Sequence, residues 1–94
     1  MTHSVEKFII NRISEVLTKY NLKKIKLNYL TTEEEDGHVY YIVRLLGGEN
    51  GHGRFSNYLE DVKHIIDAFD HAWLINWTND CLDDLWKLEF GIKL

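Results

Sequence analysis

Residues 24–46, KIKLNYLTTEEEDGHVYYIVRLL, decide the fold because they hold two strand patterns separated by a turn signal. In the first pattern Ile25, Leu27 and Tyr29 alternate with polar residues, which is the period of a half-buried strand. The second, from about residue 38 to residue 46, is rich in β-branched and aromatic residues, as strands are. The Asp-Gly pair before it readily supplies turn residues with positive φ. We therefore predict an antiparallel hairpin with an acidic tip.

A helical pattern precedes this hairpin and another follows it. Between about residues 4 and 21, with Thr2 or Ser4 as N-cap, the apolar residues recur at the spacing of one helix face. They are Val5, Ile9, Ile13, Val16, Leu17 and Tyr20. The second pattern starts near Asn57, which has capping-box spacing to Glu60. Its apolar face consists of Tyr58, Leu59, Val62, Ile65, Ile66 and Phe69.

The C-terminal quarter is ambiguous at the level of sequence. Residues 72–77 fit either an extension of the second helix or a strand, and Asn79 or Asp80 could cap a short turn. Residues 87–94 alternate like a last strand, with Leu88, Phe90 and Ile92 on one side. We predict one α+β domain over residues 1–94, in which a small antiparallel sheet of three to four strands packs against two amphipathic helices. The order is α-β-β-α, then α or β, then β.

Composition and charge narrow the function classes. The chain is 45% hydrophobic and 28% charged, as in ordinary globular proteins, and its single cysteine, Cys81, allows no internal disulfide. The sequence has no export signal and no apolar run of the roughly 18 residues that span a bilayer, so we expect a cytoplasmic protein. A formal net charge of -4 disfavours nucleic acid as the main partner. No nucleophile motif surrounds Cys81 or the serines, which favours a non-enzymatic role.

A glycine-rich segment, GGENGHGR at residues 47–54, connects the hairpin to the second helical pattern. Backbone N–H groups at a helix N-terminus can hold an anion, so Gly51 and Gly53, with Arg54 as counter-charge, are a candidate anion site. The alternative is a surface loop that makes a tight chain reversal.

Polar residues of the second helical pattern form a candidate metal site. Glu60, His64, Asp67 and His71 follow one another at helical spacing, in a narrow arc opposite the apolar face. Imidazole and carboxylate ligands one turn apart can chelate a first-row metal, and His38 is a further candidate ligand. The other interpretation is a solvated stripe in which Asp67 pairs with a neighbouring histidine.

Two segments resemble the 6-pyruvoyl-tetrahydropterin synthase and QueD family. Residues 36–40, DGHVY, are similar to its H-G-H-x-Y strand motif, and residues 69–74, FDHAWL, to its helix-terminal segment with an Asp-His pair. Aspartate stands where the family has its first motif histidine, the preceding strand has no histidine, and no cysteine precedes the motif. Only His38 matches a metal ligand, and only Asp70 and His71 match the catalytic relay. The resemblance implies a fold relative that has lost its zinc chemistry.

The surface-forming residues suggest a partner. Four acids arm the hairpin tip, namely Glu33, Glu34, Glu35 and Asp36. Trp73, Trp77 and Trp86 lie within one short stretch that also holds Asp80, Asp83 and Asp84. Tryptophan contributes much of the binding energy at interfaces, and clustered carboxylates steer a basic partner. The alternative is that the tryptophans complete the core and the acids confer solubility.

These features favour a small acidic protein-binding module, without a cofactor, that inhibits or adapts a larger basic protein. Immunity proteins and phage-encoded inhibitors of host defence nucleases have this general size and charge. In this hypothesis the tip acids steer the partner, and Trp77 or Trp86 anchors it, beside Asp80, Asp83 and Asp84. The alternatives are the metal or anion site above, and a nucleic-acid-binding accessory role. The latter needs Lys19, Lys23, Lys24 and Lys26 to share a face with Arg44 or Arg54. A homodimer also stays open.

Overall fold

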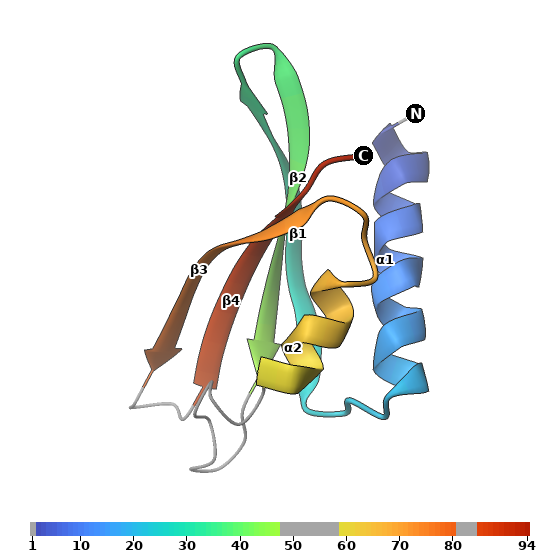
Figure 1. Cartoon of the computed structure of the whole chain (residues 1–94), viewed down its shortest axis with the longest axis vertical. Coiled ribbons are helices and arrows are strands. Elements are labelled where there is room, and N and C mark those ends of the chain that lie inside the picture. The colour runs from blue at the N-terminus through green and yellow to red at the C-terminus, as the bar shows by residue number, and fades with distance from the viewer. Residues whose placement is uncertain (1, 48–58, 81–84) are drawn as a thin grey trace.

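Two helices lie on one face of a four-stranded antiparallel sheet (Figure 1). A computed structural model describes residues 2–47, 59–80 and 85–94 of the chain. The elements are α1 (Thr2–Lys19), β1 (Ile25–Glu35), β2 (His38–Gly47), α2 (Leu59–Ile66), β3 (Ala72–Asp80) and β4 (Leu85–Ile92). The strands lie in the order β1-β2-β4-β3. The predicted α+β fold is confirmed, and the ambiguous residues 72–77 form a strand.

The core fills the space between the helices and alternate residues of the central strands. Ile9 and Ile13 of α1 and Val62 and Ile65 of α2 are buried in one cluster with the inward side chains of β2 and β4. Those inward residues are Tyr41, Val43, Leu45, Trp86, Leu88, Phe90 and Ile92. The intervening residues lie on the opposite face, because side chains alternate along a strand. We call it the open face; it carries Tyr29, Tyr40, Ile42, Arg44, Trp73, Lys87 and Glu89.

A Schellman motif ends the first helix. Asn21 has a φ of 56°, which asparagine tolerates better than most residues. Its N–H donates to the carbonyl of Thr18 over 3.2 Å, and the N–H of Leu22 donates to the carbonyl of Leu17 over 2.8 Å. Leu17 and Leu22 both pack against the core, which is the apolar contact typical of this motif. The chain therefore reverses tightly and enters β1.

The hairpin turn is shorter than the acidic segment. Asp36 and Gly37 have φ values of 52° and 79°, and Glu35 pairs with His38, as in a two-residue type I′ turn. The three glutamates before the turn therefore belong to β1 and alternate between faces. Since β4 pairs with β2 only from Tyr41 onward, the hairpin tip projects beyond the rest of the sheet (Figure 1).

A β-bulge overturns the predicted position of Tyr29. The pairing of β1 with β2 shifts register between Leu27 and Tyr29, so Tyr29 opposes Arg44 on the open face. The Arg44 guanidinium carbon lies 5.1 Å from the centre of the Tyr29 ring. Leu30 takes the inward place instead and packs against the core. Alternation alone predicted Tyr29 to face inward with Ile25, and that was wrong.

The second helix is shorter than its apolar pattern. It ends at Ile66, and Ala68 and Phe69 donate to the carbonyls of Ile65 and Ile66 in tight turns. Phe69 is buried as predicted, but Leu59 is exposed. No helix among the described residues is long and apolar enough to cross a membrane.

Candidate protein-binding surface

The acidic hairpin tip, Glu33, Glu34, Glu35 and Asp36, is exposed and divided between two faces. Glu33 opposes Tyr40, which places it on the open face, and Glu35 follows on the same side. Glu34 opposes Val39 and points to the other side of the hairpin. The acids therefore do not form one continuous patch. A flexible loop, by contrast, would let all four carboxylates gather on one side.

A surface pocket of about 250 Å³ joins this tip to β3. Its walls include the acids Glu35 and Asp36 and the aromatic rings of Tyr40 and Trp73. The two rings lie 5.4 Å apart between centroids, at an interplanar angle of 51°. His38, Val39 and Lys93 complete the lining. Carboxylates and aromatic faces thus converge on one hollow of the open face.

A glycine on β4 makes this arrangement possible. Gly91 opposes Trp73, and the Trp73 indole lies where a Cβ of residue 91 would be. The ring can therefore cross β4 close to its backbone and reach Tyr40 on β2. A larger residue at position 91 would push the indole away from the pocket.

The pocket has the chemistry to accept a lysine or arginine side chain. Carboxylates offer charge-assisted hydrogen bonds to a cation, and aromatic faces attract it through their quadrupole. Lys93 already contributes one positive charge to the rim. Its backbone N–H is fixed by a 2.9 Å hydrogen bond to the carbonyl of His71.

The tryptophans divide differently from the prediction. Trp86 is 0% exposed and packs in the core over Gly47, so it is not a surface anchor, and that part of the prediction was wrong. Trp77 is 46% exposed and opposes Leu88, on the helix side of β3. Trp73 is 41% exposed and lies on the open face. Sequence reasoning had left Trp73 and Tyr40 out of the site.

The register explains this division. Trp73 and Trp77 are four residues apart and would share a face in a regular strand. The pairing shifts between Leu74 and Asn76, which places them on opposite faces. Asp80 ends β3 opposite Leu85. Asp83 and Asp84 lie outside the described residues.

The proposed metal ligands do not come together. The N–H of Asp67 still donates to the carbonyl of Lys63, but the helix ends there, so His71 lies outside the helical arc. His38 lies at the tip of the hairpin. Within residues 2–47, 59–80 and 85–94, no three His, Cys, Asp or Glu side chains are grouped so as to hold a metal ion. The metal-site alternative is therefore wrong for these residues.

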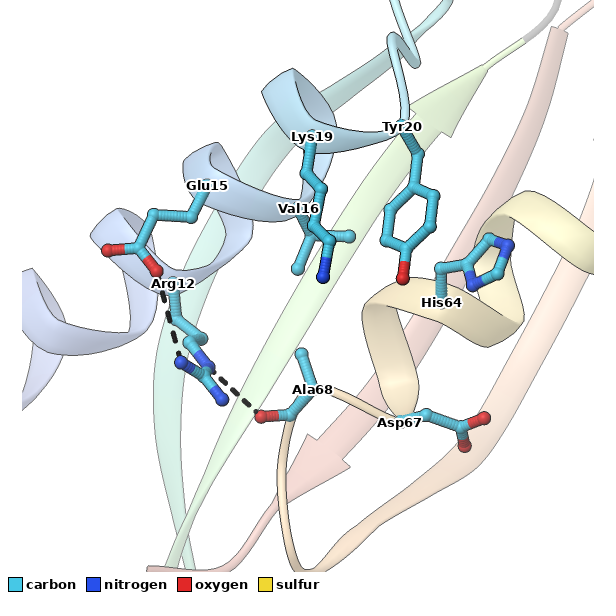
Figure 2. Close-up of a pocket in the computed structure, with 8 residues that line it drawn as sticks. All are labelled: Arg12, Glu15, Val16, Lys19, Tyr20, His64, Asp67 and Ala68. Atoms are coloured by element: carbon cyan, nitrogen blue, oxygen red, sulfur yellow. Dashed lines mark hydrogen bonds and ion pairs between the residues drawn. The ribbon is translucent and has the colours of Figure 1, made fainter.

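The imidazole of His64 instead takes part in the contact between the helices. It stacks on the Tyr20 ring with centroids 3.9 Å apart and planes within 8°. A pocket of about 420 Å³ lies between α1 and α2, and both rings line it. Figure 2 shows the Asp67 carboxylate turned away from the two rings. Arg12 and Ala68 line the same pocket, and Arg12 Nε donates a hydrogen bond to the carbonyl of Ala68 over 3.1 Å. These contacts tie the end of α2 to α1.

The other two alternatives have less structural support. Gly51, Gly53 and Arg54 lie outside the described residues, so the anion site has no geometry to judge. Lys26 opposes Leu46 and shares the open face with Arg44, but it is one of the four lysines that the nucleic-acid alternative needs on that face. However, Arg44 forms an ion pair with Glu89 at 3.5 Å, which neutralises it. Lys19 ends α1, and its ammonium group lies 5.4 Å from the centre of the Tyr20 ring.

Comparison with known proteins found no matching family model, curated protein or solved structure. The resemblance to the pterin synthase family is therefore limited to the two short segments that carry it.

Proposed function

We propose that this protein binds a basic protein partner and inhibits or adapts it, with a lysine or arginine of the partner held in the pocket beside the hairpin tip. The observation that carries the proposal is the shared lining of that pocket by Glu35, Asp36, Tyr40 and Trp73. The lining joins the hairpin tip to Trp73 of β3 on the open face, which is the side of the sheet opposite the helices.

Charge supports the same partner class. The chain has a net charge of -4, and all four tip acids are exposed. Long-range attraction speeds the encounter with a basic protein, whereas the pocket provides short-range binding energy. The tip acids thus mainly raise the association rate, and Trp73 mainly lowers the dissociation rate.

The test is affinity capture from a host lysate, followed by kinetics on the captured protein. The tip variant carries Glu33→Gln, Glu34→Gln, Glu35→Gln and Asp36→Asn. Asparagine keeps the turn conformation at residue 36, which has positive φ. The wild type should retain basic proteins, identified by mass spectrometry, and the tip variant should lose them. On a purified captured protein, the tip variant should associate about tenfold more slowly and show a flatter salt dependence.

A control variant removes the same number of acids from α1 and the turn after α2. It carries Glu6→Gln, Glu15→Gln, Asp67→Asn and Asp70→Asn. This control should capture the same proteins as the wild type, because net charge alone does not define the pocket. Equal capture by the tip variant, or equal loss in both variants, would contradict the proposal.

A further inference from the structure

The open face of the sheet is more apolar than an uncovered sheet face usually is. Antiparallel sheets that meet water on one side carry mostly polar residues there. Here the helices pack on the other side, yet the open face holds two exposed rings, Tyr29 at 45% and Trp73 at 41%. Tyr40 and Ile42 are half-buried on β2, which lies between β1 and β3 in the sheet. We call these four side chains the apolar strip.

Charged residues mark the two ends of the same face. Glu33 and Glu35 point to the open side at the hairpin tip, and both are exposed. At the other end of the sheet, Lys26 of β1 and Lys87 of β4 both oppose Leu46 of β2. Both lysines are exposed. The open face therefore runs from an acidic end, across the apolar strip, to a basic end.

The other charges of this face preserve that division. Arg44 and Glu89, in the middle, form an ion pair at 3.5 Å and add no net charge. Lys93 lies near the tip, but it shares the lining of one pocket with two acids, Glu35 and Asp36. The acidic end thus keeps a negative balance.

Charge selects how a second copy can cover this face. Packed sheets keep their strands roughly aligned, so the two tips lie either together or at opposite ends. With the tips together, carboxylates face carboxylates, and such like-charge contacts are unfavourable. With the tip of each copy over the basic end of the other, opposite charges meet at both ends. A two-fold axis then brings the two apolar strips together in the middle, because each contact of such an interface occurs twice.

We infer that two copies of this chain form a homodimer through their open faces, with the acidic tip of each copy over Lys26 and Lys87 of the other. The inference goes beyond the proposed function, and its test needs no other protein. The dimer covers the Tyr40–Trp73 pocket of both copies. A basic partner therefore competes with the second copy for the same face.

The test is a charge exchange, measured on the full chain by sedimentation equilibrium. The acidic-end variant carries Glu33→Lys and Glu35→Lys, and the basic-end variant carries Lys26→Glu and Lys87→Glu. Each variant alone should self-associate at least about tenfold more weakly than the wild type, because like charges then face each other at both ends. An equimolar mixture of the two should associate within about threefold of the wild type, because opposite charges meet again at both ends.

A matched control changes charge away from the open face. It carries Glu34→Lys and Asp67→Lys, because Glu34 points to the other side of the hairpin and Asp67 follows α2. This control alters the net charge as much as the acidic-end variant does, and it should associate within about threefold of the wild type. Far-UV circular dichroism checks that each variant is folded before mixing.

Three results would overturn the inference. The first is a wild type that stays monomeric up to about 1 mM, which would leave the open face to a different occupant. The second is a dimer that the control variant weakens as much as the acidic-end variant does. The third is a mixture that associates no better than its components. None of these results depends on the capture of basic proteins, so the homodimer and the proposed function can fail separately.

Discussion

Two tryptophans of this sheet each lie over a glycine of a neighbouring strand, one on each face. Trp86 crosses Gly47 on the helix side and is fully buried, whereas Trp73 crosses Gly91 on the open face and is 41% exposed. In both pairs the indole lies where a glycine Cβ would be. The same local device therefore fills the core in one place and shapes a surface pocket in the other. The difference lies in whether helices cover that face.

Removing the buried indole should have the largest effect. Trp86→Ala should lower the free energy of unfolding by about 3–5 kcal/mol, because it empties a large core volume between the sheet and the helices. Urea unfolding followed by far-UV circular dichroism would measure it. Trp73→Ala is the matched control, and it should cost less than about 1 kcal/mol because its ring is partly solvated. Equal losses would mean that the two pairs do not differ in role.

Adding a methyl group to each glycine tests the same comparison by overpacking. Gly47→Ala should destabilise the protein by about 1–3 kcal/mol, because the added Cβ collides with the ring of Trp86, which is fully buried. Gly91→Ala should cost less than about 1 kcal/mol, since Trp73 can swing toward solvent. Thermal and urea unfolding of both variants would measure these values. A larger loss for Gly91→Ala would contradict the assignment of the two faces.

Gly91→Ala should nevertheless disrupt the surface pocket. With the indole displaced, nuclear Overhauser contacts between the Tyr40 and Trp73 rings, now 5.4 Å apart, should disappear. The affinity for a captured basic partner should fall by about tenfold or more, as expected for an aromatic anchor. Retained ring contacts would show that the pocket tolerates a side chain at position 91.

The smallest effect concerns coupling within the exposed pair. In a Trp73→Ala background, Gly91→Ala should change the free energy of unfolding by less than about 0.5 kcal/mol, because the clash has been removed. A double-mutant cycle with urea unfolding would measure the coupling. If Gly91→Ala lowers the free energy of unfolding equally with and without Trp73, the loss arises in the β4 backbone and not from a clash with the indole.

The sequence predicted where helices and strands lie better than it predicted which side of the sheet each side chain occupies. Helix period, strand alternation and the Asp-Gly turn were enough to place both helices and the hairpin, because these are local properties. The faces of Tyr29 and Trp73 were not predictable, since each depends on a bulge that appears only when the partner strand is in place. The burial of Trp86 likewise depends on Gly47, which is distant in sequence and looked like part of a loop signal.

The candidate site was predictable only in part, for a related reason. The tip acids stand out in sequence, but their neighbours Tyr40 and Trp73 come from two strands that do not pair with each other. β4 lies between them, and only the absence of a side chain at Gly91 lets the rings meet. The histidine pattern failed because it assumed that α2 continues past Ile66.

The positions of the two bulges have a consequence for how such a chain could evolve. Both lie in edge strands, whereas β2 and β4 pair without a register shift from Tyr41 to Gly47. A bulge accommodates one extra residue. Codons can therefore be gained or lost in the edge strands without moving the remaining side chains of the strand to the opposite face. The central ladder has no such freedom, because a one-residue slip there would expose the core. Descendants of this fold could therefore diversify their recognition surface by small insertions and deletions while inheriting the same interior.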